Sequence, residues 1–491
     1  METLQLVGLL TVFLVLAALM FLRKLPALVA LPLLAFLVAL IGGVRFDHIV
    51  EYVFGHGAIK LHQAYTVAMF GSALSVMMQK TGVAESFIKK GAELGGDNPW
   101  IIAALMFALI TMLFSTLGGL GAIIMVATIV LPIMSSVGVG SLTAAGVFLL
   151  GLSIGGTLNV GNWAVYVDVM GLTVSEIRPF ALTMFGVATL AALLYITIQL
   201  YRDGHDLKLT RIAVWGGALA ALAGAAVVGY FHLLDDAGKN AVGDGLAAAS
   251  VGVTWAVGAG LGALFLYALY RAVRGLNDKA AEPHWTSYLS PVTPLFLILF
   301  FDVHFIAAFV VGLVYAFVAT HKRGSFNVLV QSIFEGGAAV MPAVVMMFGI
   351  GMLLVAIMGP SIPLAEYAGG WPTLELVKPA LRSVAPTTAI SYVLVFSLAA
   401  PLALYRGPLN VWGMGYGLAA ALIASGLEAG AVMGLLLAVG QIQGVSDPTN
   451  THNVWLANEL RVDVQKILWN TIPYTWAVAV IGLAIAALMF I

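Results

Sequence analysis

The chain has 491 residues, of which 61% are hydrophobic, and it carries 22 Lys and Arg against 23 Asp and Glu. Charged residues make up only 9% of the chain, against roughly 25% in soluble domains, so a water-soluble fold is excluded because it would have to expose large apolar patches. The net charge of −1, without a basic cluster, excludes nucleic-acid binding, and the lack of cysteine excludes disulfides and thiolate chemistry.

Apolar segments long enough to cross a bilayer recur along the chain. They cover residues 4–22, 25–43, 64–79, 178–200, 211–231, 247–270, 341–358 and 467–491. The stretch 290–320 is divided at Asp302 and His304, which predicts two short helices with a turn between them. The stretches 98–134 and 384–426 are too long for one span and are interrupted by polar residues, glycine or proline. We expect each to form a re-entrant hairpin of two half-helices.

The basic residues favour one orientation of these segments. If Arg23 and Lys24 lie in the cytoplasm, most of the other Lys and Arg residues also fall on that side. The positive-inside rule then predicts that both termini lie outside. Arg406 is an exception, because it falls in the middle of an interrupted stretch.

Two parts of the chain resemble each other. Residues 52–58 (YVFGHGA) match 332–338 (SIFEGGA), and the Asn-x-x-Asn pattern at 159–162 recurs at 450–453. The charge model gives the two parts opposite topology, which is typical of inverted-repeat secondary transporters. We therefore expect an all-α membrane protein with a first repeat over 1–200 (hairpin 98–134, broken helix 141–165), a linker with two transmembrane helices over 201–285, and a second repeat over 286–491 (hairpin 384–426, broken helix 430–455).

Polar residues gather at the predicted hairpin tips and helix breaks. Neutral amides and hydroxyls there can donate to a carboxylate, and a guanidinium can bind it as a bidentate pair. An arginine within the membrane is costly and indicates function by default, although Arg406 could instead form a structural pair with Asp447 or Glu428. The predicted substrate-binding residues are Arg406, Asn410, Asn159, Asn162, Asn453, Ser115, Thr116, Gly118 and Gly119.

The segment 445–453 is the strongest candidate for binding a coupling ion. It places a proline and several polar side chains at predicted membrane depth, where unwound carbonyls can coordinate a small cation. His452 could carry a proton or simply cap the unwound segment. The predicted ion-coupling residues are Asp447, Ser446, Thr449, Asn450 and His452. We expect no bound metal beyond a possible Na⁺ at Thr157, Asn159, Thr449 and Asn450, and no cofactor.

The pattern of hairpins and broken helices resembles the ion transporter superfamily, and more narrowly the gluconate permease family of organic-acid symporters. The narrower resemblance is carried by the Phe70-Gly71 helix, the hairpin ending Leu131-Pro132, and Val445-Ser446-Asp447-Pro448 followed by Trp455. Arg406 to Asn410 and Asn159 to Asn162 depart from what we expect of gluconate permeases. The resemblance implies a homodimer, a scaffold domain, a separate transport domain and proton symport, while related citrate and dicarboxylate carriers often use Na⁺.

The sequence thus predicts a secondary transporter that brings a small carboxylate into the cell with H⁺ or Na⁺ by alternating access. The alternative is a cation/proton antiporter on the same scaffold, in which Asp447 binds Na⁺ and H⁺ in turn. A channel is disfavoured because of the inverted broken helices. An intramembrane enzyme is disfavoured because neither a His-Glu-x-x-His motif nor a Ser/Lys dyad is present.

Overall fold

In the computed structural model, the part of the chain that the structure describes consists of helices and connecting turns, without a strand. The described residues are 2–21, 24–207, 236–278, 280–360, 362, 364–411 and 415–491. Six of the described helices are long and apolar enough to cross a membrane, or seven if one bent pair counts as a single span. The expectation of an α-helical membrane protein is therefore confirmed. The expected span over 211–231 lies outside the described residues.

The N-terminal region forms two apolar helices, an irregular helical segment and a third long helix. Its elements are α1 (Glu2–Phe21), α2 (Ala27–Ile41), α3 (Phe46–His48), the π-helix η1 (Ile49–His56), α4 (Gly57–Ile59), α5 (His62–Lys80) and α6 (Val83–Glu93). The helical path is interrupted between α4 and α5, where Leu61 leaves helical geometry at φ −102° and ψ 33°. Residues 52–58, which the repeat singled out, therefore belong to an irregular segment.

The stretch 98–134 forms two helices with a short break, as the sequence predicts. Asn98 caps α7 (Pro99–Phe114), since its side-chain oxygen accepts hydrogen bonds from the backbone of Trp100 and Ile101. The chain then turns through residues 115–119 into α8 (Leu120–Ser136). Two helices separated by Leu158 and Asn159 follow, and they are bent by 48° relative to each other. The remaining elements here are α9 (Ser141–Thr157), α10 (Val160–Met170) and α11 (Val174–Arg202).

The linker and the start of the second half contain one long helix and two short ones. The described part of the linker is α13 (Asp236–Val273), followed by the 3₁₀-helix η3 (Trp285–Leu289). The expected division of 290–320 is confirmed, because α14 (Thr293–Phe301) and α15 (Phe305–Ala319) are separated by a turn in which Asp302 has a φ of +49°.

After α15 comes a 34-residue helix, α16 (Ser325–Met358), which is much longer than the span expected over 341–358. Residues 332–338 therefore lie inside a continuous helix, unlike the irregular segment 52–58 that they match. The stretch 384–426 again gives helices around a break. The other elements are η4 (Ala365–Tyr367), α17 (Pro372–Val384), α18 (Ala389–Ala399), η5 (Ala400–Arg406), α19 (Tyr416–Ala424), α20 (Ala429–Ser446), α21 (Thr451–Glu459) and α22 (Val464–Phe490).

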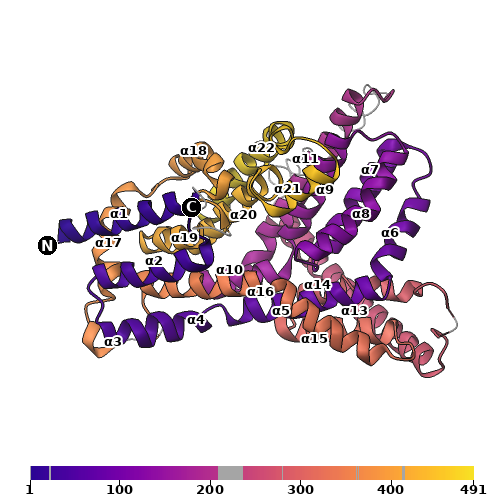
Figure 1. Ribbon diagram of the computed structural model, residues 1–491, viewed down its shortest axis with the longest axis horizontal. Coiled ribbons are helices and arrows are strands. Elements are labelled where there is room, and N and C mark those ends of the chain that lie inside the picture. The colour runs from indigo at the N-terminus through magenta and orange to yellow at the C-terminus, as the bar shows by residue number, and fades with distance from the viewer. Residues whose placement is uncertain are drawn as a thin grey trace.

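The helices form two packed groups (Figure 1). In one group α16 packs along α2 and α5, and α5 also packs against α15. In the other group α20 packs along α22, α7 packs along α9, and α9 joins the two pairs by contacting α20. The groups meet where α10 contacts α5 and where α19 contacts α16. The division into scaffold and transport domains that the resemblance implies stays a prediction.

Glycines allow close contacts between α16 and the N-terminal region. A Cβ atom added at Gly57 would lie 2.6 Å from Met352 Cα, and one added at Gly336 would lie 2.5 Å from the backbone nitrogen of Ala73. Each glycine belongs to one of the two matching segments. Gly57 contacts a later turn of α16, the helix that contains the other segment, whereas Gly336 contacts α5, the helix that follows the other segment. The inverted repeat stays a prediction.

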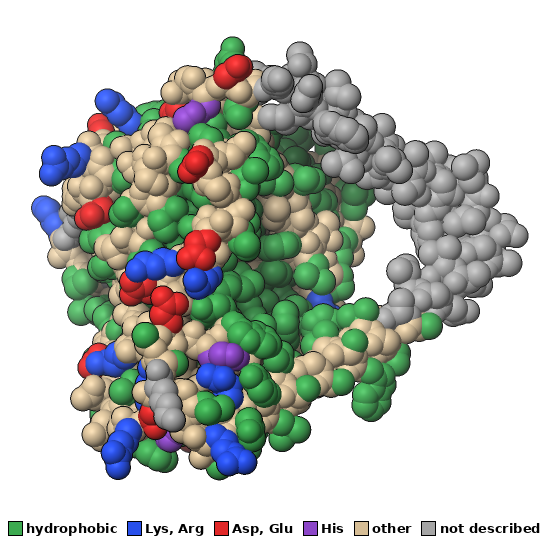
Figure 2. All heavy atoms as spheres, turned by 90° about the vertical axis from the view of Figure 1, so that its right-hand side faces the viewer, with side chains coloured by type: hydrophobic (Ala, Val, Ile, Leu, Met, Phe, Trp, Pro, Cys, Tyr) green, Lys and Arg blue, Asp and Glu red, His purple; other side chains and the backbone are tan. Residues whose placement is uncertain are grey.

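Charged side chains lie next to an apolar surface at one end of the molecule. Figure 2 looks at the right-hand end of Figure 1 and shows Lys, Arg, Asp and Glu side chains beside a hydrophobic surface. The hydrophobic surface includes α13, whose apolar window is only 6% buried. An exposed apolar helix beside a charged end is typical of a protein that contacts lipid.

Candidate functional site

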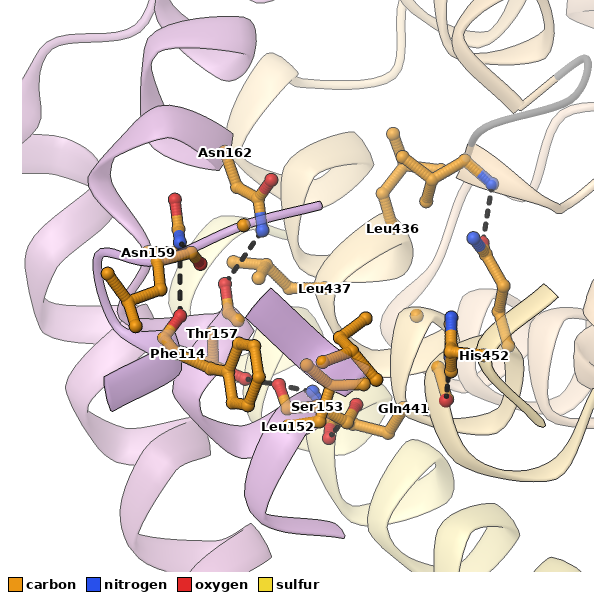
Figure 3. A pocket seen from close by; sticks show the side chains of 18 of the residues that line it. Phe114, Leu152, Ser153, Thr157, Asn159, Asn162, Leu436, Leu437, Gln441 and His452 are labelled. Carbon is orange, nitrogen blue, oxygen red and sulfur yellow. Dashed lines mark hydrogen bonds between the residues drawn. The ribbon is translucent and has the colours of Figure 1, made fainter. Parts of the chain in front are cut away.

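Two turns, together with the helix ends at both breaks, border one cavity of about 260 Å³ (Figure 3). We name the turn at residues 115–119 the first hairpin tip and the turn at residues 405–411 the second hairpin tip, and their re-entrant character stays a prediction. Gly118 and Gly119 line it from the first tip, and Val411 lines it from the second tip. The first break contributes Asn159 and Asn162. The remaining lining residues of α9, α10, α19, α20 and α21 include Ser153, Gly156, Thr157, Tyr166, Tyr416, Gly440, Gln441, Gln443, Gly444 and His452. Segments about 290 residues apart in the sequence therefore surround the same space.

The first hairpin tip presents backbone to this cavity. Gly119 has a φ of +87°, a conformation that favours glycine, and it precedes α8 without any side-chain cap. Gly118 and Gly119 are exposed, and a Cβ atom at either would meet no atom within 4 Å. The first N–H groups of α8 lack partners within the helix, and the helix dipole makes this end positive. The tip can therefore receive an anion.

Ser115 and Thr116, which were also predicted to bind substrate, have structural partners. The Ser115 hydroxyl donates to the carbonyl of Met112 at 2.7 Å, and the Thr116 hydroxyl donates to the carbonyl of Pro291. Both side chains are buried, and neither residue lines the large cavity. These hydroxyls close the end of α7 and fix the tip against the loop that precedes α14.

The first helix break is held by its two asparagines. Asn159 donates from Nδ2 to the carbonyls of Phe114 at 3.0 Å and Leu117 at 3.3 Å, while its Oδ1 accepts from the backbone of Gly161. Asn162 donates from Nδ2 to the carbonyl of Gly156 at 2.9 Å. Asn159 therefore ties the break to the first hairpin tip. Asn162 also lines the cavity, where Figure 3 shows it near Asn159.

The second hairpin tip is held by Asp447. This carboxylate is fully buried and accepts from the backbone N–H of Tyr405 at 3.0 Å and from Asn410 Nδ2 at 3.3 Å. Thr449 donates to the same carboxylate from its backbone at 2.9 Å and from its hydroxyl at 2.7 Å. Tyr405 has a φ of +54°, a strained conformation for a bulky residue, so its hydrogen bond helps to hold the turn.

Arg406 lies at this junction, in the last position of η5 and next to Tyr405. Its side chain is outside the described residues, so its predicted contact with a substrate stays a prediction. Asn410 is buried and donates to the carbonyl of Ala403 at 3.1 Å as well as to Asp447. Asn410 thus fixes the second tip, while its neighbour Val411 reaches the cavity.

The other predicted ion-coupling residues surround the second break without sharing one site. Ser446 is within hydrogen-bond distance of the hydroxyls of Thr471 at 2.8 Å and Thr475 at 2.9 Å, on α22. Asn450 Nδ2 donates to the carbonyl of Gln443, and His452 Nε2 lies 3.1 Å from the carbonyl of Gly444. Among these residues, His452 is the one that lines the cavity.

Asn453 is the repeat partner of Asn162 but does not line the cavity. Its Nδ2 donates to the carbonyl of Val445 at 2.8 Å, and its buried Oδ1 has no hydrogen-bond partner. The four residues suggested for Na⁺ divide between two places. Thr157 and Asn159 line the cavity, whereas Thr449 and Asn450 lie at the junction with Asp447.

Two glutamines of α20 were not predicted and are central to the site. Gln441 Nε2 donates to the Thr157 hydroxyl at 2.8 Å, and its Oε1 accepts from the Ser153 hydroxyl at 3.0 Å. Gln443 Oε1 accepts from the backbone of Val411 at 2.6 Å. Gln441 therefore joins the two halves, and Gln443 joins α20 to the second tip. The sequence feature that could have identified them is a pair of amide side chains, separated by one residue, in an otherwise apolar helix.

A second cavity of about 190 Å³ also borders the first hairpin tip. It shares Gly118, Gly119, Asn159 and Asn162 with the large cavity. Its remaining walls come mainly from α5 and α16, which belong to the other packed group. The glycine tip therefore borders two cavities, one of which is also lined by the other group of helices.

No protein-family model matches the chain, and no curated protein is significantly similar to it. Two solved structures of transport proteins are similar to it at low identity. One is the YdaH transporter of Alcanivorax borkumensis, with 14% identity, a TM-score of 0.49, and coverage of 90% of this chain and 87% of that one. The other is MtrF of Neisseria gonorrhoeae, described as one of a class of antimetabolite efflux pumps, with 11% identity, a TM-score of 0.44, and coverage of 91% and 83%.

Proposed function

We propose that the chain is a secondary transporter that carries a small carboxylate across a bacterial inner membrane together with H⁺ or Na⁺. The observation that carries this proposal is the large cavity, because both hairpin tips and both helix breaks border it. Two related halves around one central space suit alternating access.

The cavity lining supports an anionic substrate. The described lining residues include amides, hydroxyls and one imidazole, but no Lys, Arg, Asp or Glu. The N-terminus of α8 directs partial positive charge toward the space at Gly118 and Gly119, and α10 begins beside it at Asn159. A carboxylate can therefore bind to neutral donors and helix ends. In this proposal, Arg406 adds a guanidinium from the second tip.

The same lining supports coupling to a cation. An anion that enters an uncharged, partly desolvated cavity loses its hydration, and a cation bound nearby offsets that cost. Gly156 and Gly444 line the cavity near the C-terminal ends of α9 and α20, and the C-terminal end of a helix carries partial negative charge that favours a cation. Asp447 with Thr449 and Asn450 forms the second proposed place for the coupling ion. A homodimer of the gluconate-permease kind, with the scaffold at its centre, completes the proposal.

The test is uptake by proteoliposomes that contain the purified chain. A panel of small organic acids is offered under an inward Na⁺ gradient, an inward proton gradient, or neither. We expect at least one acid to accumulate only when one of the gradients is present, and we expect Arg406→Ala to lose that uptake. Cation exchange that needs no organic anion would contradict symport and favour the antiporter. Full uptake by Arg406→Ala would remove the proposed role of this residue.

A further inference from the structure

A third cavity, of about 260 Å³, lies apart from the proposed substrate site. The ends of α5 and α15, the beginning of α16 and the loop after α13 form its walls, and none of its lining residues is shared with the other two cavities. The loop after α13 and the end of α15 lie at the right-hand end of Figure 1, where Figure 2 shows charged side chains. The transport proposal does not use this cavity.

Basic side chains dominate the charge around this cavity. Lys80, Lys322 and Arg323 line it, and Glu282 is the one acidic residue among the described lining residues. Lys80 is paired with Glu335 of α16 at 2.8 Å. The remaining basic groups of the lining, Lys322 and Arg323, are offset in part by Glu282 and by Asp278, whose carboxylate accepts from the backbone N–H of Arg323 at 2.8 Å.

Arg271 is a further basic residue that contacts the lining of this cavity. Arg271 of α13 donates from Nε to the side chain of Asn277, which lines the space. The basic groups thus come from α5, from α13 and from the loop between α15 and α16.

Lys322 and Arg323 lie directly before α16, at the end of the helix that carries partial positive charge. Gly324 has a φ of +88° and precedes the helix without a side-chain cap. The Ser325 hydroxyl accepts from the backbone of Lys322 at 2.7 Å, and Lys322 Nζ donates to the carbonyl of Ala280 at 2.9 Å. Lys322 is therefore held at the rim, and Arg323 follows it. The dipole of a 34-residue helix adds to the positive potential at this point.

An apolar surface lies next to the charged cavity. On the last turns of α13, Leu269, Tyr270 and Val273 are exposed, Val273 by 79%. A ligand that fits both features has an anionic phosphate group and hydrocarbon chains. Basic pockets between membrane helices are known to bind such headgroups. Glu282 could accept a hydrogen bond from a headgroup hydroxyl or ammonium beside the phosphate.

We propose that this cavity binds the phosphodiester of a phospholipid, with the acyl chains along α13. The site joins the linker to α5 and α16, two helices that pack closely where Gly336 meets Ala73. A bound lipid would therefore hold the linker against the scaffold group. This inference rests on the membrane location of the chain and is independent of what the chain transports.

Native mass spectrometry of the full chain in detergent tests the proposal. Phosphatidylglycerol is titrated against the wild type, the double variant Lys322→Gln/Arg323→Gln and the control Arg461→Gln/Lys466→Gln. The two control residues are exposed near the start of α22 and line none of the three cavities. We expect the double variant to bind phosphatidylglycerol about tenfold more weakly or worse, and the control to bind it like the wild type.

Two further ligands distinguish binding of a phospholipid from binding of hydrocarbon chains alone or of free phosphate. Diacylglycerol carries the same chains without phosphate, and we expect it to bind weakly and equally to all three proteins. Inorganic phosphate is expected to give no thermal stabilisation at concentrations where phosphatidylglycerol stabilises the wild type. Equal binding of phosphatidylglycerol by wild type and double variant would overturn the proposal. Stabilisation by inorganic phosphate alone would overturn the assignment to a lipid.

Discussion

Gly118→Leu is expected to reduce substrate uptake by about 100-fold or more while the protein stays folded, because a loss of roughly 3 kcal/mol in binding free energy corresponds to about that factor. Gly118 lines both the large and the second cavity. A Cβ atom at this position meets no atom within 4 Å, so the new side chain enters open space and displaces substrate without forcing the tip apart. The measurement is proteoliposome uptake of the acid that the panel identifies, together with thermal stability in detergent.

Gly186→Leu is the matched control for this variant. Gly186 lies on α11, and a Cβ atom there also meets nothing within 4 Å, but the residue lines neither cavity. We expect it to transport like the wild type. If Gly118→Leu is folded and transports normally, the first hairpin tip is not on the substrate path.

Replacement of Asp447 should have the second large effect, and it should separate folding from transport. At least three groups donate to this buried carboxylate: the Tyr405 backbone, Asn410 Nδ2, and Thr449 through both its backbone and its hydroxyl. In Asp447→Ala these buried donors lose their acceptor, and each unsatisfied group costs roughly 1–3 kcal/mol. We expect a clear fall in the melting temperature and no uptake.

Asp447→Asn keeps the size of the side chain and one carbonyl oxygen. We expect it to fold, because the Tyr405 and Thr449 donors can still bond to that oxygen, but to lose ion-coupled uptake. Glu459→Gln is the control, since this residue occupies the exposed end of α21. A folded Asp447→Asn with wild-type uptake under an ion gradient would exclude a coupling role for the carboxylate.

Helices that are marked by an apolar run of spanning length could be predicted from the sequence. The spans expected over 178–200 and 467–491 correspond to α11 and α22, and the turn at Asp302 was marked by polar residues inside an apolar run. These features are local, because consecutive residues determine whether a segment is long enough to span the membrane or contains a helix break. The sequence therefore predicted most helices without knowledge of their packing.

Differences between the two halves could not be predicted from the matching segments. Residues 332–338 continue α16, whereas residues 52–58 form a π-helical segment followed by a break. The two expected broken helices also differ. The helices α9 and α10 are bent by 48° relative to each other, whereas residues 429–459 form one candidate membrane span. The choice between a bent and a continuous helix depends on tertiary packing, such as the contact of Gly336 with Ala73.

The sequence located the candidate site better than it assigned roles within it. Asn159, Asn162 and the glycine tip do line one cavity with His452. Asp447 and Asn410 instead bond to each other and hold the second tip. Whether a polar side chain faces a cavity or a neighbouring carbonyl depends on the path of the chain beyond the break, which composition does not encode. The bridging role of Gln441 was missed for the same reason, because its partners lie in the other half.

Cysteine labelling tests the shared cavity most directly, because the native chain contains no cysteine. Gly118→Cys and Gly440→Cys place single thiols on the cavity from the first and the second half, and in both cases the new Cβ meets no atom within 4 Å. We expect the transported acid to slow maleimide labelling of both thiols over the same concentration range and to leave Gly186→Cys unaffected. Protection of only one cavity thiol, or of neither, would contradict a single binding site between the two halves.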